Sequence, residues 1–187
     1  MTVEHNNKET TTPSELVASL TKQLPREAML EEALTGLQLN TKADGASLYI
    51  KHGEALRFHI IKNKTLNMDM NASSAAIKSL QEIPLHSTGN QHSSISAYCA
   101  ITKKSINVVD ISLETRVDLG PTKAFDTKFN YQTKSILATP ILDNKQNVLG
   151  VIQLINAQNE GQSFNETHVQ ACAEVAAIIS NVLNNGH

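Results

Sequence analysis

Apolar residues recur with helical spacing near the start of the chain. A capping box at residues 12–15 has proline at the first helical position, and it is followed on one face by Leu16, Leu20 and Leu24. Pro25 interrupts this run, and the helical period resumes from Arg26 to Leu39. The pattern predicts an N-terminal helical segment over residues 12–40, as two helices or one kinked helix. The polar residues 1–11 are predicted to form a flexible tail.

A second helical pattern occupies the end of the chain. Asn165 is placed to cap it, and Phe164 and Val169 are placed to form a hydrophobic staple. The helix is predicted to run to about Leu183, with two apolar stripes: Val169, Cys172, Ala176, Ile179 and Leu183 on one, and Val175, Ile178 and Val182 on the other. One stripe is enough to cover a sheet. The second therefore needs another partner, either the N-terminal helices or the same helices of a second subunit.

Between these helices the period changes to that of β-strands. Residues 46–50 and 56–61 flank a turn at residues 52–54, which predicts a β-hairpin. Residues 135–142 and 148–155 alternate or are continuously apolar, which predicts a second hairpin made of central strands. Helices at the ends and hairpins in the middle indicate an α+β fold built on an antiparallel sheet.

The segment between the hairpins carries weaker signals. A short helix is predicted at residues 74–80, and residues 83–85 are predicted to be an edge strand because proline cannot donate a hydrogen bond inside a sheet. Residues 94–102 have helical spacing, and residues 106–110 form a predicted short strand. Residues 112–130 are predicted to be irregular.

Composition narrows the class of protein. The 187 residues are 40% hydrophobic and carry a formal net charge of -2, which fits one globular domain. Lysine and arginine form no run that could follow a phosphate backbone, so no nucleic-acid partner is expected. The sequence shows no apolar stretch long enough to cross a bilayer and no signal-peptide pattern. We therefore expect a cytoplasmic protein with no membrane partner.

No recognisable catalytic or metal-binding pattern is present in the sequence. Cys99 and Cys172 lie far apart and follow no CxxC or Cys/His spacing, so both are expected to be small core residues. His86 and His92 lack an HExxH or carboxylate spacing. No Ser/His/Asp or paired-carboxylate arrangement stands out. We expect no catalytic residue, no metal site and no enzymatic activity.

Two stretches resemble a known family. The first comprises Phe125–Asp126, Tyr131, Thr133, Ser135, Leu137 and Pro140 with residues 150–156, and the second comprises residues 95–102 and 106–108 with Asp110. Together they resemble the GAF domains of cyclic-nucleotide phosphodiesterases and bacterial adenylyl cyclases, over a region from about Ala43 to Leu183. Residues 41–187 are accordingly interpreted as a GAF domain that includes the C-terminal helix.

The resemblance implies a fold and a pocket. The family has a central six-stranded antiparallel sheet with the N- and C-terminal helices packed on one face. On the other face, loops and short helices cover a small-molecule pocket. By similarity, residues 125–133 form a short helix and loop over this pocket, and Ser135 begins a central strand.

The resemblance also assigns ligand-binding residues. By similarity, Ile95 and Ser96 offer backbone N–H groups, while the polar side chains that reach the ligand include Asp126 and Thr133. The complete set is Ser47, Ile95, Ser96, Phe125, Asp126, Phe129, Thr133 and Gln153. Taken from the residues alone, Asp126 is equally a loop cap, and Ser96 is more often a helix N-cap than a ligand group.

Several positions depart from nucleotide-binding members of the family. The Phe-Asp pair that contacts a base is replaced near Ile61–Lys62, and Phe129 stands where these members often have threonine. The Asn-Lys...Phe-Asp-Glu signature is reduced to Asn156–Ala157, Phe164 and His168–Val169. Because both members of its buried ion pair are missing, no unpaired charge is left behind. A cyclic nucleotide is therefore a weaker candidate ligand than another small metabolite.

These features lead to two hypotheses. The first is a non-enzymatic sensory module that binds a small molecule, signals through its terminal helices, and forms a homodimer through them, with a signalling enzyme as a candidate partner. The second is a scaffold for dimerisation or docking, whose vestigial pocket is filled by Tyr98, Phe125 and Phe129. One branch of the family reduces free methionine sulfoxide with clustered reactive cysteines, which two isolated cysteines do not provide.

Overall fold

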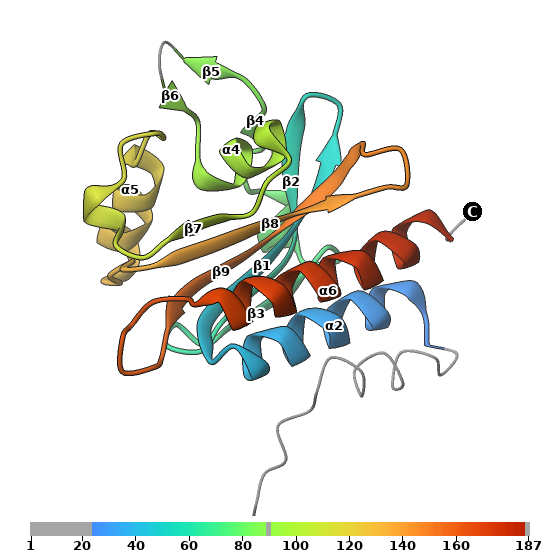
Figure 1. Ribbon diagram of the computed structural model, residues 1–187, viewed down its shortest axis with the longest axis horizontal. Helices are drawn as coiled ribbons and strands as arrows, with labels where there is room; N and C mark the ends of the chain where they lie inside the picture. The colour runs from blue at the N-terminus through green and yellow to red at the C-terminus, as the bar shows by residue number, and fades with distance from the viewer. Residues whose placement is uncertain (1–23, 89–90, 186–187) are drawn as a thin grey trace, which may run out of the picture.

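A seven-stranded antiparallel sheet forms the middle layer of the protein, as the computed structural model shows (Figure 1). The structure describes residues 24–88 and 91–185. Six strands follow the order β3-β2-β1-β9-β8-β7, and β4 pairs with β2 beside them. The bounds are β1 Ala43–His52, β2 Ala55–Asn63, β3 Met68–Asn71, β4 Ile83–Pro84, β7 Ile106–Val108, β8 Ile136–Leu142 and β9 Val148–Ala157. The predicted tail and the helix predicted before Pro25 lie outside the described residues.

Both predicted hairpins are confirmed, and they meet in the centre of the sheet. β1 pairs with β2, β8 pairs with β9, and β1 and β9 join the two hairpins. Residues 43–49 of β1 and 150–154 of β9 are buried without interruption. A strand covered on both faces needs few polar residues, which explains the nearly continuous apolar run of β9 in the sequence. The predicted edge strand is also confirmed, as β4.

The first face of the sheet is covered by the two long helices. Figure 1 shows α2 (Arg26–Asn40) and α6 (Glu166–Asn184) side by side on this face. Leu34 of α2 and Ile179 of α6 are fully buried in one cluster with Leu48, Ile152 and Leu154 of the sheet. Burying apolar side chains of this size stabilises the fold by about 1.5–3 kcal/mol each. The expectation that the terminal helices share one face is confirmed.

The second face carries short elements. They are α3 (Ala75–Lys78), α4 (Ile95–Thr102), the 3-10 helix η1 (Ile111–Leu113), α5 (Gly120–Phe129), and a small sheet of β5 (Ser87–Thr88) with β6 (Gln91–His92). A second buried cluster lies beneath them, in which Ile95 and Cys99 of α4 join Tyr49, Ile136 and Val151 of the sheet. The protein therefore has a hydrophobic core on each face of the sheet.

The prediction that residues 112–130 are irregular is wrong. α5 occupies ten of them, and the helix begins at Gly120, earlier than the short helix expected from residue 125. Pro121 lies at the start of the helix, where its missing N–H is not needed. None of the helix residues is fully buried. A helix that buries so little leaves no apolar stripe for the sequence to show.

The predicted cap of the last helix is confirmed. The Asn165 side-chain oxygen accepts a hydrogen bond from the His168 backbone N–H at 3.1 Å, and the Asn165 backbone N–H donates to Nδ1 of His168 at 3.2 Å. This is a reciprocal capping box with histidine in the third position. Because Nδ1 of His168 is the acceptor of this hydrogen bond, the capping box requires that Nδ1 carry no proton.

We expect the stability of the protein to depend on the ionisation of His168. Desolvation, with a smaller effect of Lys42, lowers the pKa of His168. The unfolded chain, with an ordinary pKa of about 6.5, therefore binds the proton first as the pH falls. The contribution of His168 to the stability of the folded protein is complete above about pH 6.5 and is lost as the pH falls below this value. His168→Gln retains a capping-box residue without the titration, so urea unfolding should show a smaller loss of stability between about pH 7.5 and pH 5.5. Equal losses in both proteins would contradict the linkage.

Candidate functional site

The first turn of α4 contains two of the predicted residues. Ser94 caps this helix, because its Oγ accepts a hydrogen bond from the Ala97 N–H at 3.1 Å. Ser96 is therefore not the N-cap; it is 1% exposed, and its hydroxyl donates to Oε1 of Gln153 at 2.5 Å. Ile95 is buried in the apolar cluster between α4 and the sheet. The serine hydroxyl thus connects α4 with a central strand.

The sheet register brings Ser47 beside this contact. Ser47 on β1 pairs with Gln153 on β9, and Tyr49 lies on the same face of β1 as Ser47. Burial raises the pKa of Tyr49 to about 12, and hydrogen bonds with Ser96 and Ser47 oppose the shift. All four side chains are buried. They form a polar cluster inside an otherwise apolar layer.

A second group of predicted residues lies on α5 and the turn that follows it. One carboxylate oxygen of Asp126 accepts from the Thr133 N–H at 2.9 Å, and the other accepts from the Thr133 hydroxyl at 2.8 Å. Asn130 ends the helix with φ of 47°, and the Tyr131 N–H donates to the Asp126 carbonyl at 2.9 Å. Asp126 therefore holds the turn closed. A ligand that binds this carboxylate must compete with Thr133.

The aromatic side chains of α4, of α5 and of the turn after α5 form two separate clusters. The rings of Phe125 and Phe129 lie 4.8 Å apart, and the ring of Tyr131 meets Phe125 edge-on at 6.1 Å. Tyr98 stacks on His92 at 4.6 Å, with the guanidinium of Arg116 at 5.2 Å from its ring centre. The three aromatic residues considered for filling a vestigial pocket therefore do not form one cluster.

The eight predicted residues fall into two groups. Ser47, Ile95, Ser96 and Gln153 lie between α4 and the sheet, whereas Phe125, Asp126, Phe129 and Thr133 lie on α5 and its turn. Within the part of the chain that the structure describes, no hydrogen bond or ring contact joins one group to the other. Ligand binding by these residues stays a prediction.

Sequence reasoning missed the contacts that fasten the turn after α5 to the sheet. The Tyr131 hydroxyl donates to Oδ2 of Asp44 on β1 at 2.6 Å, and Nδ2 of Asn156 donates to the Tyr131 hydroxyl oxygen at 3.0 Å. Burial, reinforced by the Asp44 carboxylate, raises the pKa of Tyr131. The only signal in the sequence is that two polar residues, Asp44 and Asn156, interrupt apolar strands.

Asn156 contributes most to this connection. Besides Tyr131, its Nδ2 donates to the Gln132 carbonyl at 2.7 Å, and its Oδ1 accepts from the backbone N–H of Lys134 at 2.7 Å and of Ser135 at 3.3 Å. Its backbone has φ of 55°, a left-handed conformation that asparagine tolerates better than most residues. The residue thus joins the end of β9 to the segment between α5 and β8.

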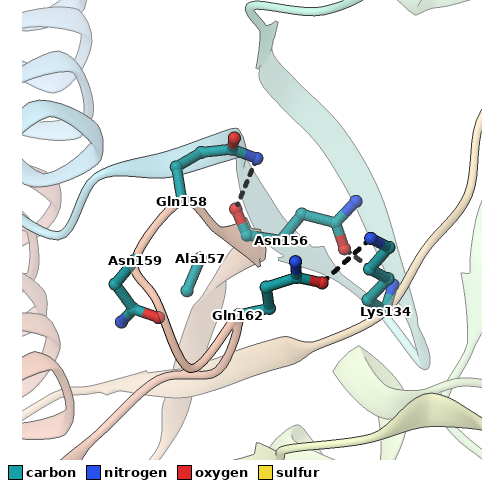
Figure 2. A pocket seen from close by; sticks show the side chains of 6 residues that line it. All are labelled: Lys134, Asn156, Ala157, Gln158, Asn159 and Gln162. Carbon is teal, nitrogen blue, oxygen red and sulfur yellow. Dashed lines mark hydrogen bonds between the residues drawn. The ribbon is translucent and has the colours of Figure 1, made fainter.

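A small polar pocket lies beside this residue at the end of β9. Its volume is about 170 Å³, and it is lined by Lys134, Asn156, Ala157, Gln158, Asn159 and Gln162. Nζ of Lys134 donates to Oε1 of Gln162 at 2.9 Å, and both side chains line the pocket (Figure 2). None of the eight predicted residues lines it. The polar run that follows β9, residues 158–163, was its only sign in the sequence.

Both cysteines are buried in the core. Burial raises the pKa of both thiols, to about 12 at Cys172, so neither forms the reactive thiolate near neutral pH. The described residues contain no group of three or more His, Cys, Asp or Glu side chains that could hold a metal ion. No helix in the described ranges is both long and apolar enough to span a membrane.

Comparison with known proteins establishes the family. The GAF domain profile matches residues 25–183. The chain belongs to the GAF domain family. A cGMP-specific 3',5'-cyclic phosphodiesterase from Drosophila sechellia is 26% identical over 162 residues, which cover 83% of this chain but 12% of the phosphodiesterase. The chain therefore spans only a small part of that relative.

Solved GAF structures agree with the fold. The GAF domain of a phosphoenolpyruvate-protein phosphotransferase from Coxiella burnetii has a TM-score of 0.69 at 15% identity, covering 92% of this chain and 90% of that domain. The free methionine-R-sulfoxide reductase from Neisseria meningitidis, solved with its substrate, has a TM-score of 0.66 at 11% identity, covering 98% and 95%. At such low identity, these similarities concern the fold alone.

Proposed function

We propose that this GAF domain is a non-enzymatic regulatory module that binds a small molecule between α4, α5 and the sheet. The observation that carries the proposal is the buried hydrogen bond between Ser96 and Gln153. Polar side chains in an apolar layer are stable only when paired, and a ligand with a donor and an acceptor could replace either partner. The N–H groups of Ile95 and Ser96, in the first turn of α4, supply further donors.

The output of such a module passes through α2 and α6. These helices cover the opposite face of the sheet from the proposed ligand site (Figure 1). Ile178 and Val182 on α6 are half-buried, and Leu39 on α2 is 60% exposed, so apolar surface remains for a second subunit. A ligand would act by favouring one arrangement of the paired helices over another. A homodimer, a signalling enzyme as partner and a cytoplasmic location belong to this proposal.

The absence of enzymatic activity is also part of the proposal. Cys99 is buried beneath α4 and its pKa is raised, which disfavours thiolate chemistry at this face. Asp126, the one acid among the predicted ligand-binding residues, already accepts two hydrogen bonds from Thr133. A carboxylate engaged in this way is poorly placed for general base catalysis.

Thermal unfolding with candidate ligands tests the proposal. Cyclic GMP is tested first because the Drosophila relative is a cGMP-specific phosphodiesterase. Cyclic AMP and a panel of metabolites follow. A ligand that binds only the folded state is expected to stabilise it by about 2.7 kcal/mol at a hundredfold excess over its Kd. We expect Asp126→Ala to abolish this shift and Asp143→Ala to retain it, because Asp143 closes the turn between β8 and β9 in a similar way and no predicted ligand-binding residue lies in that turn.

A second function, the scaffold, is favoured by one observation. Asp126 is satisfied by Thr133, and Phe125 packs on Phe129, so the turn over the proposed pocket is closed by its own side chains. The scaffold predicts a dimer by sedimentation and no thermal shift with any compound. That result would overturn the sensor proposal.

A further inference from the structure

The outer edge of the sheet is interrupted opposite the middle of β2. β3 pairs with residues 60–63 of β2, and β4 pairs with residues 55–56. Both strands run antiparallel to β2 along its outer side, so they form one edge strand with a gap. Among the described residues, no strand pairs with residues 57–59 on that side. The chain between β3 and β4, residues 72–82, contains α3 and lies outside the sheet.

A pocket of about 430 Å³ lies at this gap. Its lining includes all three residues of the interrupted edge, five residues from the 72–82 segment, and the end of β1. This volume is in the range of pockets that hold small organic ligands, about 300–1,000 Å³. The pocket shares no residue with the proposed site beneath α4 and α5.

One part of the pocket wall is apolar. Phe58 of β2 and Ile77 of α3 both line the pocket, and Ile77 is 5% exposed. Leu80 is 42% exposed, which makes it one of the few large apolar side chains that water reaches in the described part of the chain. A ligand with an apolar portion would cover Leu80 and gain hydrophobic stabilisation.

The charged part of the wall is mainly basic. Lys51, Arg57 and Lys78 line the pocket, and Glu82 is its one acidic lining residue. Lys51 meets Glu54 only at 3.8 Å, and the glutamate side chain is 88% exposed, so this pair is weak. Lys78 takes part in none of the ion pairs of the described residues. The chain as a whole has a net charge of -2, so the positive character is local.

We propose that this pocket binds a small organic anion. Its carboxylate or phosphate group lies between Arg57 and Lys78, and its apolar portion packs against Leu80. Arginine and lysine are the side chains that proteins use most for such groups, and the apolar wall selects an organic anion over an inorganic one.

Glu82 acts as the internal competitor of this ligand. Its carboxylate forms an ion pair with Nε of Arg57, and the two side chains are 40% and 51% exposed. Exposed ion pairs contribute little stability, so an anionic ligand can displace Glu82 from Arg57. Removing the arginine and removing the glutamate therefore have opposite expected effects on affinity.

Amide chemical shifts measured by NMR during titration test the site. The probes are phenyl phosphate and phenylacetate, with phenylacetamide as the neutral counterpart. We expect both anions to shift the amides of Phe58, Ile77 and Leu80, and phenylacetamide to bind about tenfold more weakly, which is the value of one charged hydrogen bond. Arg57→Gln should weaken binding of the anions about tenfold, and Glu82→Gln should strengthen it several-fold. Lys145→Gln, a charge-matched change in the loop between β8 and β9, should leave affinity unchanged.

Three results would overturn the proposal. They are the absence of shifts at the gap, equal binding of phenylacetamide and phenylacetate, and equal effects of Arg57→Gln and Lys145→Gln. Shifts confined to residues 95–96 and 126–133 would place the probe at the other face of the sheet, which leaves the sensor proposal intact while removing this one. The substituted side chains are at least 40% exposed at Arg57 and Glu82, so both variants are expected to fold.

Discussion

Gly150→Ala is expected to lower the free energy of unfolding by more than about 4 kcal/mol, a value reached only by severe structural conflicts. A β-carbon at residue 150 would lie 2.1 Å from the carbonyl oxygen of Tyr49 and 3.2 Å from its carbonyl carbon. Both atoms belong to the backbone of β1, so no side chain can rotate away to make room. Gly150 pairs with Ile50 on β1 and with Ile141 on β8, and any displacement disturbs two ladders of hydrogen bonds.

Circular dichroism during heating and urea unfolding would measure this loss. For a chain of this length about 1 kcal/mol corresponds to 2–4 °C, so the melting temperature should fall by about 10 °C or more. Gly161→Ala is the matched control, because the atoms nearest to its added β-carbon lie at 3.6 and 3.8 Å. The free energy of unfolding of Gly161→Ala should stay within about 0.5 kcal/mol of that of the unsubstituted protein. Equal stability of the two variants would contradict the close approach of β1 and β9.

This close approach also positions the candidate site. Tyr49, whose carbonyl meets Gly150, belongs to the buried polar cluster with Ser47 and Ser96. The register that pairs Ile50 with Gly150 also pairs Ser47 with Gln153. A change at residue 150 would therefore disturb the proposed ligand site as well as stability.

The elements that could be predicted from the sequence are those with a strong local pattern. The first hairpin was evident from the turn at residues 52–54, and the second because β9 is covered on both faces and such strands have long apolar runs. The last helix was evident because Asn165 and the residues after it form a cap within four positions. The pattern of apolar residues did not reveal α5, and only the family resemblance indicated part of it, because its side chains, including Phe125 and Phe129, are at most half-buried.

The candidate sites depend on contacts between residues far apart in the chain. Asp44 and Tyr131 are separated by 87 positions, and Ser96 and Gln153 by 57, so no local pattern marks either pair. The family resemblance supplied Ser47, Ser96 and Gln153 as a set, which the register of the sheet then brought together. The pocket at the gap in β2 follows from where β3 ends and β4 begins; Pro84 marked β4 in the sequence, but the end of β3 had no sequence signal.

Asn156→Ala is expected to lower the free energy of unfolding by about 2–4 kcal/mol. The substitution removes the partner of the buried Ser135 N–H, and a buried group left unpaired costs about 1–3 kcal/mol; the Lys134 N–H and the Gln132 carbonyl, which are more exposed, also lose their partner at a smaller cost. It also places alanine at φ of 55°, which adds roughly 1 kcal/mol of backbone strain. The segment after α5 loses its connection to β9, while Tyr131 keeps its bond to Asp44.

Asn156→Gly separates these two causes. Glycine loses the same side-chain hydrogen bonds but adopts the left-handed conformation without strain, so its loss of stability should be smaller by about 1 kcal/mol. Amide hydrogen exchange would report on the hydrogen bonds directly, because the Lys134 N–H should lose protection in both variants. Equal stability of the alanine and glycine variants would show that backbone strain plays no part. Unchanged protection at Lys134 would show that Asn156 does not hold the turn, and that the Asp126–Thr133 bonds keep it closed by themselves.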